Sequence, residues 1–145
     1  MTKIKAKKLK MSQVYQGGSV VAVTPVKVVS VNDDAQVTDL GLAVGSRVKV
    51  SGFSRGKGFQ GVVKRHGFHG GPKTHGQKNR WRAPGSIGST APQHVFPGRK
   101  MAGRTGGSKN TAFNSIVELD EKNKIIYLSG AVPGMRGSLV NIIAE

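Results

Sequence analysis

The two flanks of the chain carry the hydrophobic patterns of β-strands. Residues 19–31 read SVVAVTPVKVVSV, and this valine-rich run predicts a strand in which Pro25 marks a break, an edge or a bulge. In the segment VGSRVKVSG, Val44, Val48 and Val50 alternate with polar residues, which predicts a half-buried strand leading into the middle of the chain. Both segments are typical of a β fold.

The C-terminal flank predicts a hairpin and a further strand. The segments NSIVEL and KIIYLSG surround DEKN, a turn-forming cluster, and the last apolar run reads LVNII. At the N-terminus, MTKIKAKKLKM alternates lysines with apolar residues, a pattern that fits a solvated strand face as well as an RNA contact. No apolar repeat of helical period extends over a helical length. We therefore expect a small β body formed by residues 1–51 and 108–145.

The segment between the flanks has a different composition. Residues 52–107 hold 14 of the 21 glycines, 4 of the 6 prolines and only 13 apolar residues in 56 positions. Such a segment cannot bury enough apolar surface to order itself, whereas the flanks can form a core. The expected fold is therefore mainly β: a small β body with a long, basic, glycine-rich, irregular extension loop over residues 52–107.

The charge balance indicates an anionic partner. The chain has 23 Lys and Arg against 7 Asp and Glu, a net charge of +16. Residues 40–117 contain no acid, yet they hold fourteen of the basic residues and all four histidines. Positive charge this concentrated favours a nucleic acid or an acidic membrane as partner. We expect no membrane, because no apolar run approaches roughly 20 residues and the basic stretches are too rich in Gly and Pro for an amphipathic helix.

Metal binding and catalysis are alternatives that the sequence disfavours. The absence of cysteine excludes disulfides and cysteine-based zinc sites, and it fits a reducing compartment. No carboxylate lies near the histidines to orient a metal ligand, and the surrounding Lys and Arg repel a cation. We expect no metal and no catalytic residue, since a hydrolase also needs an orienting acid. The histidines are His66, His69, His75 and His94.

Basic and aromatic residues interleave throughout the extension. Lysine and arginine contact phosphates, planar rings stack on unpaired bases, and glycine lets the backbone approach a phosphate closely. A flexible segment of this kind suits irregular, partly single-stranded RNA better than regular duplex DNA. The candidate RNA-binding residues are Arg55, Lys57, Lys64, Arg65, His66, Lys73, His75, Lys78, Arg80, Trp81, Arg82, Arg99, Lys100 and Arg104.

Residues 56–61 raise a competing interpretation. They read GKGFQG, which matches the dinucleotide pattern G-x-G-x-x-G and, with Val63, the glycine-rich loop of a kinase. A dinucleotide site needs a helix directly after the glycine segment and an acidic residue about 20 residues after it. Here glycines and Pro72 preclude a helix of useful length, and the first acid is Glu118. We therefore expect no nucleotide cofactor, and we interpret these glycines as a hinge into the extension with Phe59 as its anchor.

Longer motifs resemble a known family. The segments SGFSRGKGFQGVVKRHGF, THG, RAPGSIGS and FPGRKMAGRTGG, together with AVPG and KKLKMSQVY, are similar to those of the large-subunit ribosomal protein L-three family of bacterial type. The resemblance implies a β-barrel body on the surface of the large ribosomal subunit and a long loop that reaches into ribosomal RNA. It also implies early binding in subunit assembly, no enzymatic activity, no cofactor and no small-molecule substrate. The implied partners are large-subunit ribosomal RNA and neighbouring ribosomal proteins.

The resemblance also implies positions for the parts of the loop. Its basic arms would be residues 64–82 and 99–104, and its tip would lie near the peptidyl transferase centre. The tip residues are Pro84, Gly85, Ser86, Ile87, Gly88 and Ser89. The implied location is the cytoplasm, in the ribosome, because no transit peptide to an organelle is visible.

Three departures from the family pattern change these expectations. Residues 31–43 replace several tens of residues, so we expect reduced accessory elements in the barrel. Ala6 and Lys10 stand where glycines are usual, which alters the expected turn there. The segment STAP shortens the stretch past the tip, so we expect no methylated glutamine and do not assign that role to Gln93.

Three functions from different classes are therefore compared. We favour a structural, RNA-binding component of the large ribosomal subunit. The alternatives are a nucleotide-dependent enzyme built on GKGFQG and a free-standing nucleic-acid compaction protein. Saturable binding of ATP or NAD would favour the enzyme, and co-migration with the large subunit separates the ribosomal component from the compaction protein.

Overall fold

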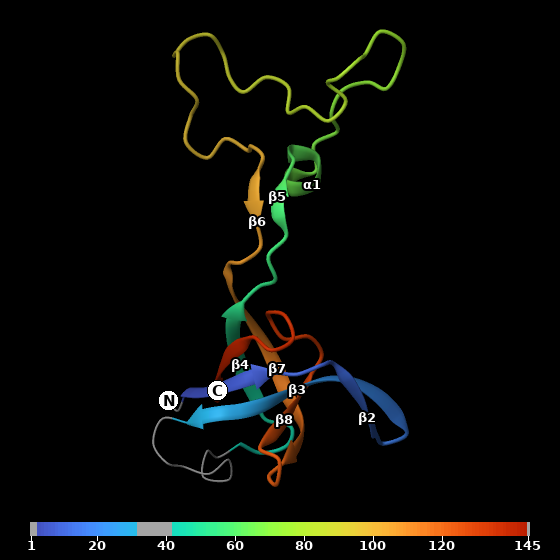
Figure 1. Cartoon of the computed structure of the whole chain (residues 1–145), viewed down its shortest axis with the longest axis vertical. Helices are drawn as coiled ribbons and strands as arrows, with labels where there is room; N and C mark the ends of the chain where they lie inside the picture. The colour runs from blue at the N-terminus through green and yellow to red at the C-terminus, as the bar shows by residue number, and fades with distance from the viewer. Residues whose placement is uncertain (1–2, 32–41, 145) are drawn as a thin grey trace. The chain divides into compact units, whose positions relative to one another are not determined.

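Six antiparallel strands close into a barrel in the computed structural model, which describes residues 3–31 and 42–144. The strands are β1 (Lys3–Lys8), β3 (Ser19–Val31), β4 (Arg47–Phe53), β7 (Lys109–Asp120), β8 (Ile125–Ser129) and β9 (Leu139–Ala144). Their order is β1-β9-β4-β7-β8-β3, and pairing of β3 with β1 completes the circle (Figure 1). The expected β class and barrel body are confirmed.

The chain divides into two compact units. The body, Met1–Arg55 with Gly107–Glu145, contains the barrel, and the extension is Gly56–Gly106. In the extension, β5 (Gly58–Gln60) pairs with β6 (Gly103–Thr105), and α1 (Val62–His66) follows β5. The segment expected to reduce the accessory elements lies mostly outside the described residues, and the RNA-penetrating role of residues 52–107 stays a prediction.

Alternating apolar residues fill the barrel. In β4, Val48 and Val50 are buried whereas Arg47 and Lys49 are exposed, as the alternation predicts. Each buried aliphatic side chain contributes roughly 1.5–3 kcal/mol relative to an exposed one, so this cluster is the main stabilising element of the body. The core residues are Ile4, Ala6, Val26, Val28, Leu42, Val48, Val50, Ile116, Ile126, Leu128, Val132, Val140 and Ile142.

Val44 does not belong to this strand, contrary to the prediction. β4 begins at Arg47, and Val44 lies in the preceding turn, where it is 56% exposed. The hydroxyl of Ser46 donates to the carbonyl oxygen of Ala43 at 2.7 Å, and Gly45 has a φ of 89°. The turn therefore ends the alternation before the strand starts.

Pro25 lies inside β3 without breaking it. Residues 19–23 pair with β2 (Ser12–Gln16) and residues 26–31 pair with β1, so Pro25 stands where the neighbouring strand changes. On that side its carbonyl oxygen accepts the N–H of Leu9 at 2.9 Å. Because a strand residue directs its N–H and C=O to the same side, the missing donor falls where no ladder bond is required.

The predicted C-terminal hairpin is confirmed as β7 and β8, and the apolar run after it is β9. In the turn between β7 and β8, Asp120 accepts the side-chain amide of Asn123 at 2.8 Å and its backbone N–H at 3.1 Å. These two bonds, the side-chain one first, hold the pKa of Asp120 below its usual value. The turn is thus fixed by hydrogen bonds between the first and last residues of DEKN.

Hydrogen bonds, rather than a hydrophobic core, order the extension. Val62 is the one buried apolar side chain of this unit, all of whose residues the structure describes. The β5–β6 pair is extended by the N–H of Lys57, which donates to the carbonyl oxygen of Thr105 at 2.9 Å. Helix α1, which the sequence did not predict, ends at Gly67 with a φ of 73°, and the N–H of Gly67 donates to the carbonyl oxygen of Val63.

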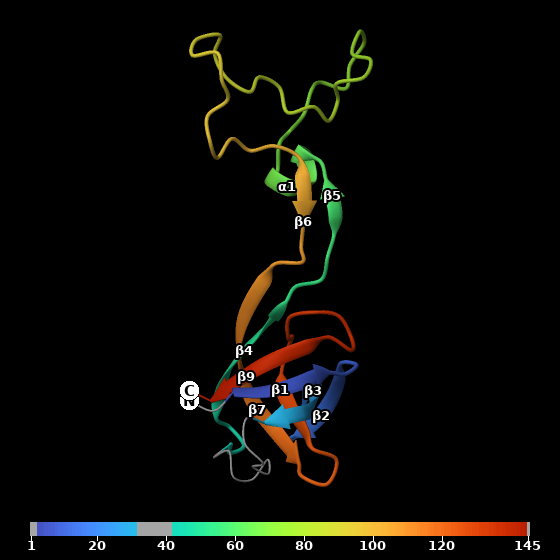
Figure 2. The ribbon, with the colours of Figure 1, turned by 60° about the vertical axis from the view of Figure 1, so that its left-hand side comes forward.

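Two loops of the extension are each closed by a hydrogen bond, and both ribbon views show them as separate lobes (Figures 1 and 2). They are the first loop, residues 70–82, and the second loop, residues 86–99. In the first loop, the N–H of Gly71 donates to the carbonyl oxygen of Trp81 at 2.9 Å. In the second loop, the guanidinium of Arg99 donates to the carbonyl oxygen of Ser86.

The inward face of β9 gives a first testable prediction. Ile142 is fully buried, so Ile142→Ala removes apolar contacts, leaves a cavity and should lower the free energy of unfolding by about 2–5 kcal/mol. Leu139 lies on the same strand but is 61% exposed, and Leu139→Ala should change this free energy by less than about 0.5 kcal/mol. Urea unfolding followed by far-UV circular dichroism measures both. Equal losses would contradict the inward assignment of Ile142.

The closure of the first loop gives a second prediction. A Cβ on Gly70 would collide with the carbonyl oxygen of Trp81, so Gly70→Ala should open the loop. Gly85→Ala is the matched control, since its φ of 78° is close to the 77° of Gly70 but a Cβ there meets nothing within 4 Å. In each variant the alanine must adopt a left-handed backbone conformation, which costs roughly 1–2 kcal/mol.

The readout for this pair is the fluorescence of Trp81, the single tryptophan of the chain. Gly70→Ala should increase quenching of Trp81 by acrylamide, because the indole is released from its loop, whereas Gly85→Ala should leave the quenching unchanged. The same quenching in both variants would show that the contact between Gly70 and Trp81 does not hold the loop.

Candidate nucleic-acid interface

The predicted RNA-binding side chains lie at the surface, and most of them belong to the extension. All are exposed except His66, which is half-buried. Arg55 lies in the body and the others in the extension. The extension carries ten lysines and arginines and no acidic residue, so no carboxylate of its own neutralises this charge. Like charges gathered in one unit repel each other, and an anionic partner relieves that repulsion.

Helix α1 uses two of the predicted residues to hold the returning segment. Nη1 of Arg65 donates to the carbonyl oxygen of Met101 at 3.0 Å, and Nε2 of His66 lies 3.0 Å from the same oxygen. Because a carbonyl oxygen only accepts, His66 carries a proton on Nε2. A Cβ on Gly103 would collide with Nη1 of Arg65, so glycine permits this approach. Arg65 and His66 therefore have a structural role that the sequence did not indicate.

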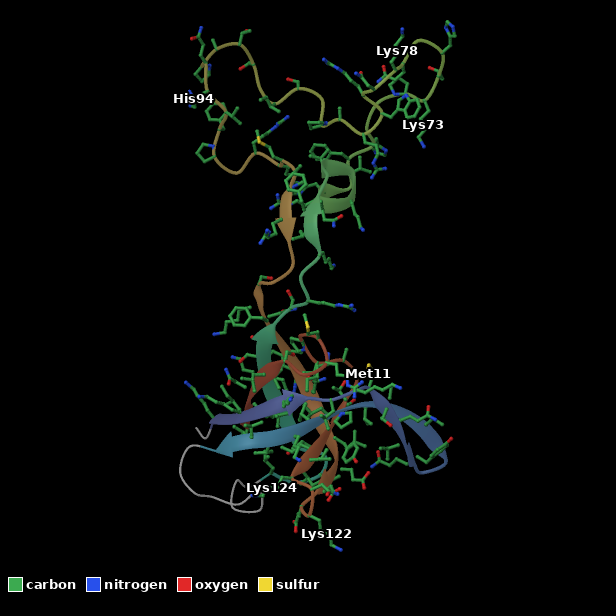
Figure 3. All side chains as sticks on the ribbon, in the orientation of Figure 1. Met11, Lys73, Lys78, His94, Lys122 and Lys124 are labelled. Carbon is green, nitrogen blue, oxygen red and sulfur yellow. The ribbon has the colours of Figure 1, made fainter. Side chains whose placement is uncertain are left out.

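The first loop gathers the largest group of predicted residues. Figure 3 shows Lys73 and Lys78 on this loop. Trp81 is 49% exposed, and its indole N–H donates to the carbonyl oxygen of Gln77 at 3.3 Å. This bond fixes one edge of the ring while about half of the residue stays open for stacking on a base. The predicted residues on the loop are Lys73, His75, Lys78, Arg80, Trp81 and Arg82.

The predicted tip, residues 84–89, follows the first loop and includes the start of the second. All of its residues are exposed. The hydroxyl of Ser86 donates to the carbonyl oxygen of Gly88 at 3.0 Å, while the carbonyl oxygen of Ser86 accepts the guanidinium of Arg99. Arg99 thus joins the returning arm to the tip, and Lys100 after it is exposed. The position of the tip near a catalytic centre stays a prediction.

Two further aromatic contacts involve histidines of the extension. The ring centroids of His66 and Phe68 lie 6.0 Å apart, and those of His94 and Phe96 lie 5.3 Å apart in an edge-to-face arrangement. Figure 3 shows His94 on the second loop. Such pairs present flat aromatic faces on which an unpaired base can stack.

Neither a metal cluster nor a spanning helix is present in the described part of the chain. Among residues 3–31 and 42–144, no three His, Asp or Glu side chains gather where they could hold a metal ion. Within the same ranges no helix has both the length and the apolar character to cross a bilayer. The expected stacking or hydrogen-bonding role of the histidines stays a prediction.

The GKGFQG segment lacks the surroundings of a nucleotide-binding turn. β5 belongs to a two-stranded antiparallel sheet, whereas a dinucleotide turn follows a strand of a parallel sheet. Helix α1 is five residues long, and of the glycines in the segment Gly58 alone has a positive φ, 67°. Phe59 is 73% exposed, so the expectation that it anchors the hinge is wrong.

The body carries a cationic and aromatic cluster that the sequence did not reveal. The guanidinium carbon of Arg47 lies 5.1 Å from the ring centroid of Phe113, and the ammonium nitrogen of Lys49 lies 5.9 Å from it. Alternation in β4 placed Arg47 and Lys49 on one face. Phe113 joins them only through the β4–β7 register, in which it lies opposite Lys49. A local pattern carries no information about that pairing.

Strand β1 has the solvated face that the lysine alternation predicts. Ile4 and Ala6 are buried, and contact of the opposite face with RNA stays a prediction. Lys8 differs from the other lysines: its ammonium donates to the carbonyl oxygens of Val132 at 2.6 Å and Gly134 at 2.9 Å. Burial lowers the pKa of Lys8 below its usual value. The exposed lysines of the strand are Lys3, Lys5 and Lys7.

Comparison with known proteins gives one family and several relatives. The family profile described as Ribosomal protein L3 matches residues 1–122. The large ribosomal subunit protein uL3 of Herpetosiphon aurantiacus is 50% identical over 101 residues, which cover 68% of this chain and 48% of that protein. The proteins of the same name from Prochlorococcus marinus (strain MIT 9515) and Chlorobium limicola are 47% and 50% identical, and the alignments cover 74% and 69% of this chain and 50% and 49% of theirs. The chain thus spans about half the length of the curated relatives it matches. Because the family profile matches most of its residues, the chain belongs to the Ribosomal protein L3 family.

Proposed function

We propose that this chain is a structural, RNA-binding component of the large ribosomal subunit. The observation that carries the proposal is the extension, with ten basic residues, no acid and one buried apolar side chain. Relatives at 47–50% identity are named large ribosomal subunit proteins, and the Ribosomal protein L3 family is structural and non-enzymatic. The proposed role needs no cofactor and no small-molecule substrate.

The proposed mechanism is neutralisation of phosphates where RNA segments converge. Lysine and arginine side chains of the extension contact phosphates, and each neutralised phosphate releases about 0.7–0.9 of a condensed counterion. Exposed rings such as Trp81 stack on unpaired bases. Without the RNA, the charges of the extension repel one another, so binding and ordering of this unit reinforce each other.

The finer proposal concerns the tip and the place of the chain in the ribosome. We place residues 84–89 near the peptidyl transferase centre and assign the chain an early role in assembly, in a cytoplasmic ribosome. The resemblance in RAPGSIGS supports this placement, as does the exposure of every tip residue. The body would then contact RNA and neighbouring ribosomal proteins from the subunit surface.

Charge removal on the first loop tests the mechanism. The double variant Lys73→Gln/Lys78→Gln should reduce the slope of log affinity for large-subunit ribosomal RNA against log salt by about 1.4–1.8, because two phosphate contacts are lost. The control Lys122→Gln/Lys124→Gln removes the same charge from the β7–β8 turn of the body and should leave the slope nearly unchanged (Figure 3). Filter binding over a potassium chloride series measures both slopes. If both pairs lowered the slope equally, the charge of the extension would not be the specific contact.

Sedimentation tests the assignment to the ribosome, and a deletion tests the tip. On a sucrose gradient of cell extract the chain should migrate with the large subunit; migration with bulk nucleic acid instead would favour a compaction protein.

Deleting residues 85–89 removes no core residue, so the free energy of unfolding of the body should change by less than about 0.5 kcal/mol. Subunits that carry the deletion should translate more slowly. Loss of the cooperative melting would contradict the division into two units.

A further inference from the structure

An open cavity is lined by the segment after α1, by the first loop and by the start of the tip. Its volume is about 760 Å³, which is within the usual range of ligand sites. We infer that this cavity holds one unpaired nucleobase of an RNA strand, an assignment that rests on the proposed binding of RNA by the extension. The lining residues that carry the argument are Phe68, Gln77, Arg80 and Pro84.

Backbone contacts shape the walls of the cavity in the absence of any ligand. The bond from Gly71 to the carbonyl oxygen of Trp81 closes the first loop, and Gly70 leaves no room for a side chain against the same oxygen. A Cβ on Gly71 would lie 2.7 Å from the side-chain nitrogen of Gln77, so this amide lies directly against the glycine backbone. The main chain of Gln77 is held on both sides, by the carbonyl oxygen of Thr74 and by the indole of Trp81, each at 3.3 Å.

The lining offers the groups that recognise a nucleobase. Phe68 supplies an aromatic ring and Pro84 a flat apolar one, and bases stack on surfaces of this kind. The amide of Gln77 presents a donor and an acceptor side by side, which matches the edge of a base. Arg80 adds a guanidinium that can bind the phosphate of the same nucleotide, and the extension has no carboxylate that would repel this phosphate.

Lysines around the cavity favour a base within an RNA strand over a free nucleotide. Lys73 and Lys78 are exposed on the first loop, and Lys78 directly follows Gln77 in the chain (Figure 3). They extend the positive charge beyond the cavity, to where a strand carries the phosphates of adjacent nucleotides. A free nucleotide has no group that reaches them, so its affinity should be the lower of the two.

The test uses the full chain and a short single-stranded RNA that contains 5-bromouridine, with AMP and UMP as separate ligands. Fluorescence of Trp81 reports binding, because its indole is bonded to the carbonyl oxygen of Gln77, a residue that lines the cavity. Phe68→Leu keeps an apolar side chain but removes the ring, and it should weaken RNA binding by about 5-fold or more. Phe53→Leu makes the same change at an exposed ring of the body, outside the cavity, and should weaken binding by less than about 2-fold.

A second variant tests recognition of the base edge and does not depend on Phe68. Gln77→Ala removes the amide that would read the base edge. The ratio of the affinities for oligouridine and oligoadenosine should therefore move about 5-fold closer to one, a change that a purely structural role would not produce. Under ultraviolet light the wild-type chain should cross-link bromouridine within residues 67–85, as located by mass spectrometry. Quenching of Trp81 by acrylamide in the absence of RNA verifies that each variant keeps the first loop closed.

The outcomes separate this inference from the proposed function. Cross-links confined to other residues, or equal losses for Phe68→Leu and Phe53→Leu, would overturn the cavity assignment and leave salt-dependent binding of ribosomal RNA intact. AMP or UMP binding more tightly than the oligonucleotide would assign the cavity to a free nucleotide and overturn the RNA assignment. Absence of any salt-dependent binding of ribosomal RNA would refute the proposed function itself.

Discussion

Hydrogen bonding of β1 to two strands at once is the contact on which the body depends. Residues 3–7 pair with β9 near the C-terminus, and residues 4–8 pair with β3. This double pairing joins the two ends of the chain and leaves none of the six barrel strands as a bare sheet edge. The chain segment between β4 and β7 must therefore leave the barrel and return to it between these two adjacent strands. The bonds between Ser54 and its partners Gly107 and Ser108, at 3.2 and 2.8 Å, close the chain at that point.

The extension is a unit whose order cannot come from burial. Fixing the backbone of one residue costs about 1–2 kcal/mol, whereas a single buried valine contributes roughly 1.5–3 kcal/mol. Val62 alone is therefore far too little for a segment of this length. Local bonds restrict the two loops to few conformations, and in the proposed function contact with ribosomal RNA supplies the remaining stabilisation. Restricting a loop in advance reduces the entropy that binding must remove, so the same bonds serve both shape and affinity.

The strands followed from the sequence because their signals are local, but long-range features did not. Valine-rich and alternating runs predicted β3, β4, β7, β8 and β9, whereas SQVYQ of β2 is too polar to stand out. The pair Gly17 and Gly18, with φ of 57° and 79°, was the available signal for that hairpin. In the site, composition located the charge of the extension. It could not give the contact of Gly71 with Trp81 or the ring of Phe113 beside Arg47, because those depend on backbone angles and strand register.

Arginines in the extension serve as structural donors without losing their charge. With no carboxylate in this unit, the side chains that close it must bond to backbone carbonyl oxygens, as Arg65 does to Met101 and Arg99 does to Ser86. Such a bond leaves the guanidinium charged, and its fork of N–H groups allows one donor to bond internally while others face a phosphate. An ammonium group concentrates its charge at a single atom and has no such fork. The use of arginine at these two contacts, with Lys73 and Lys78 exposed on the first loop, therefore fits a unit that holds its own shape and still presents its charge to the proposed RNA partner.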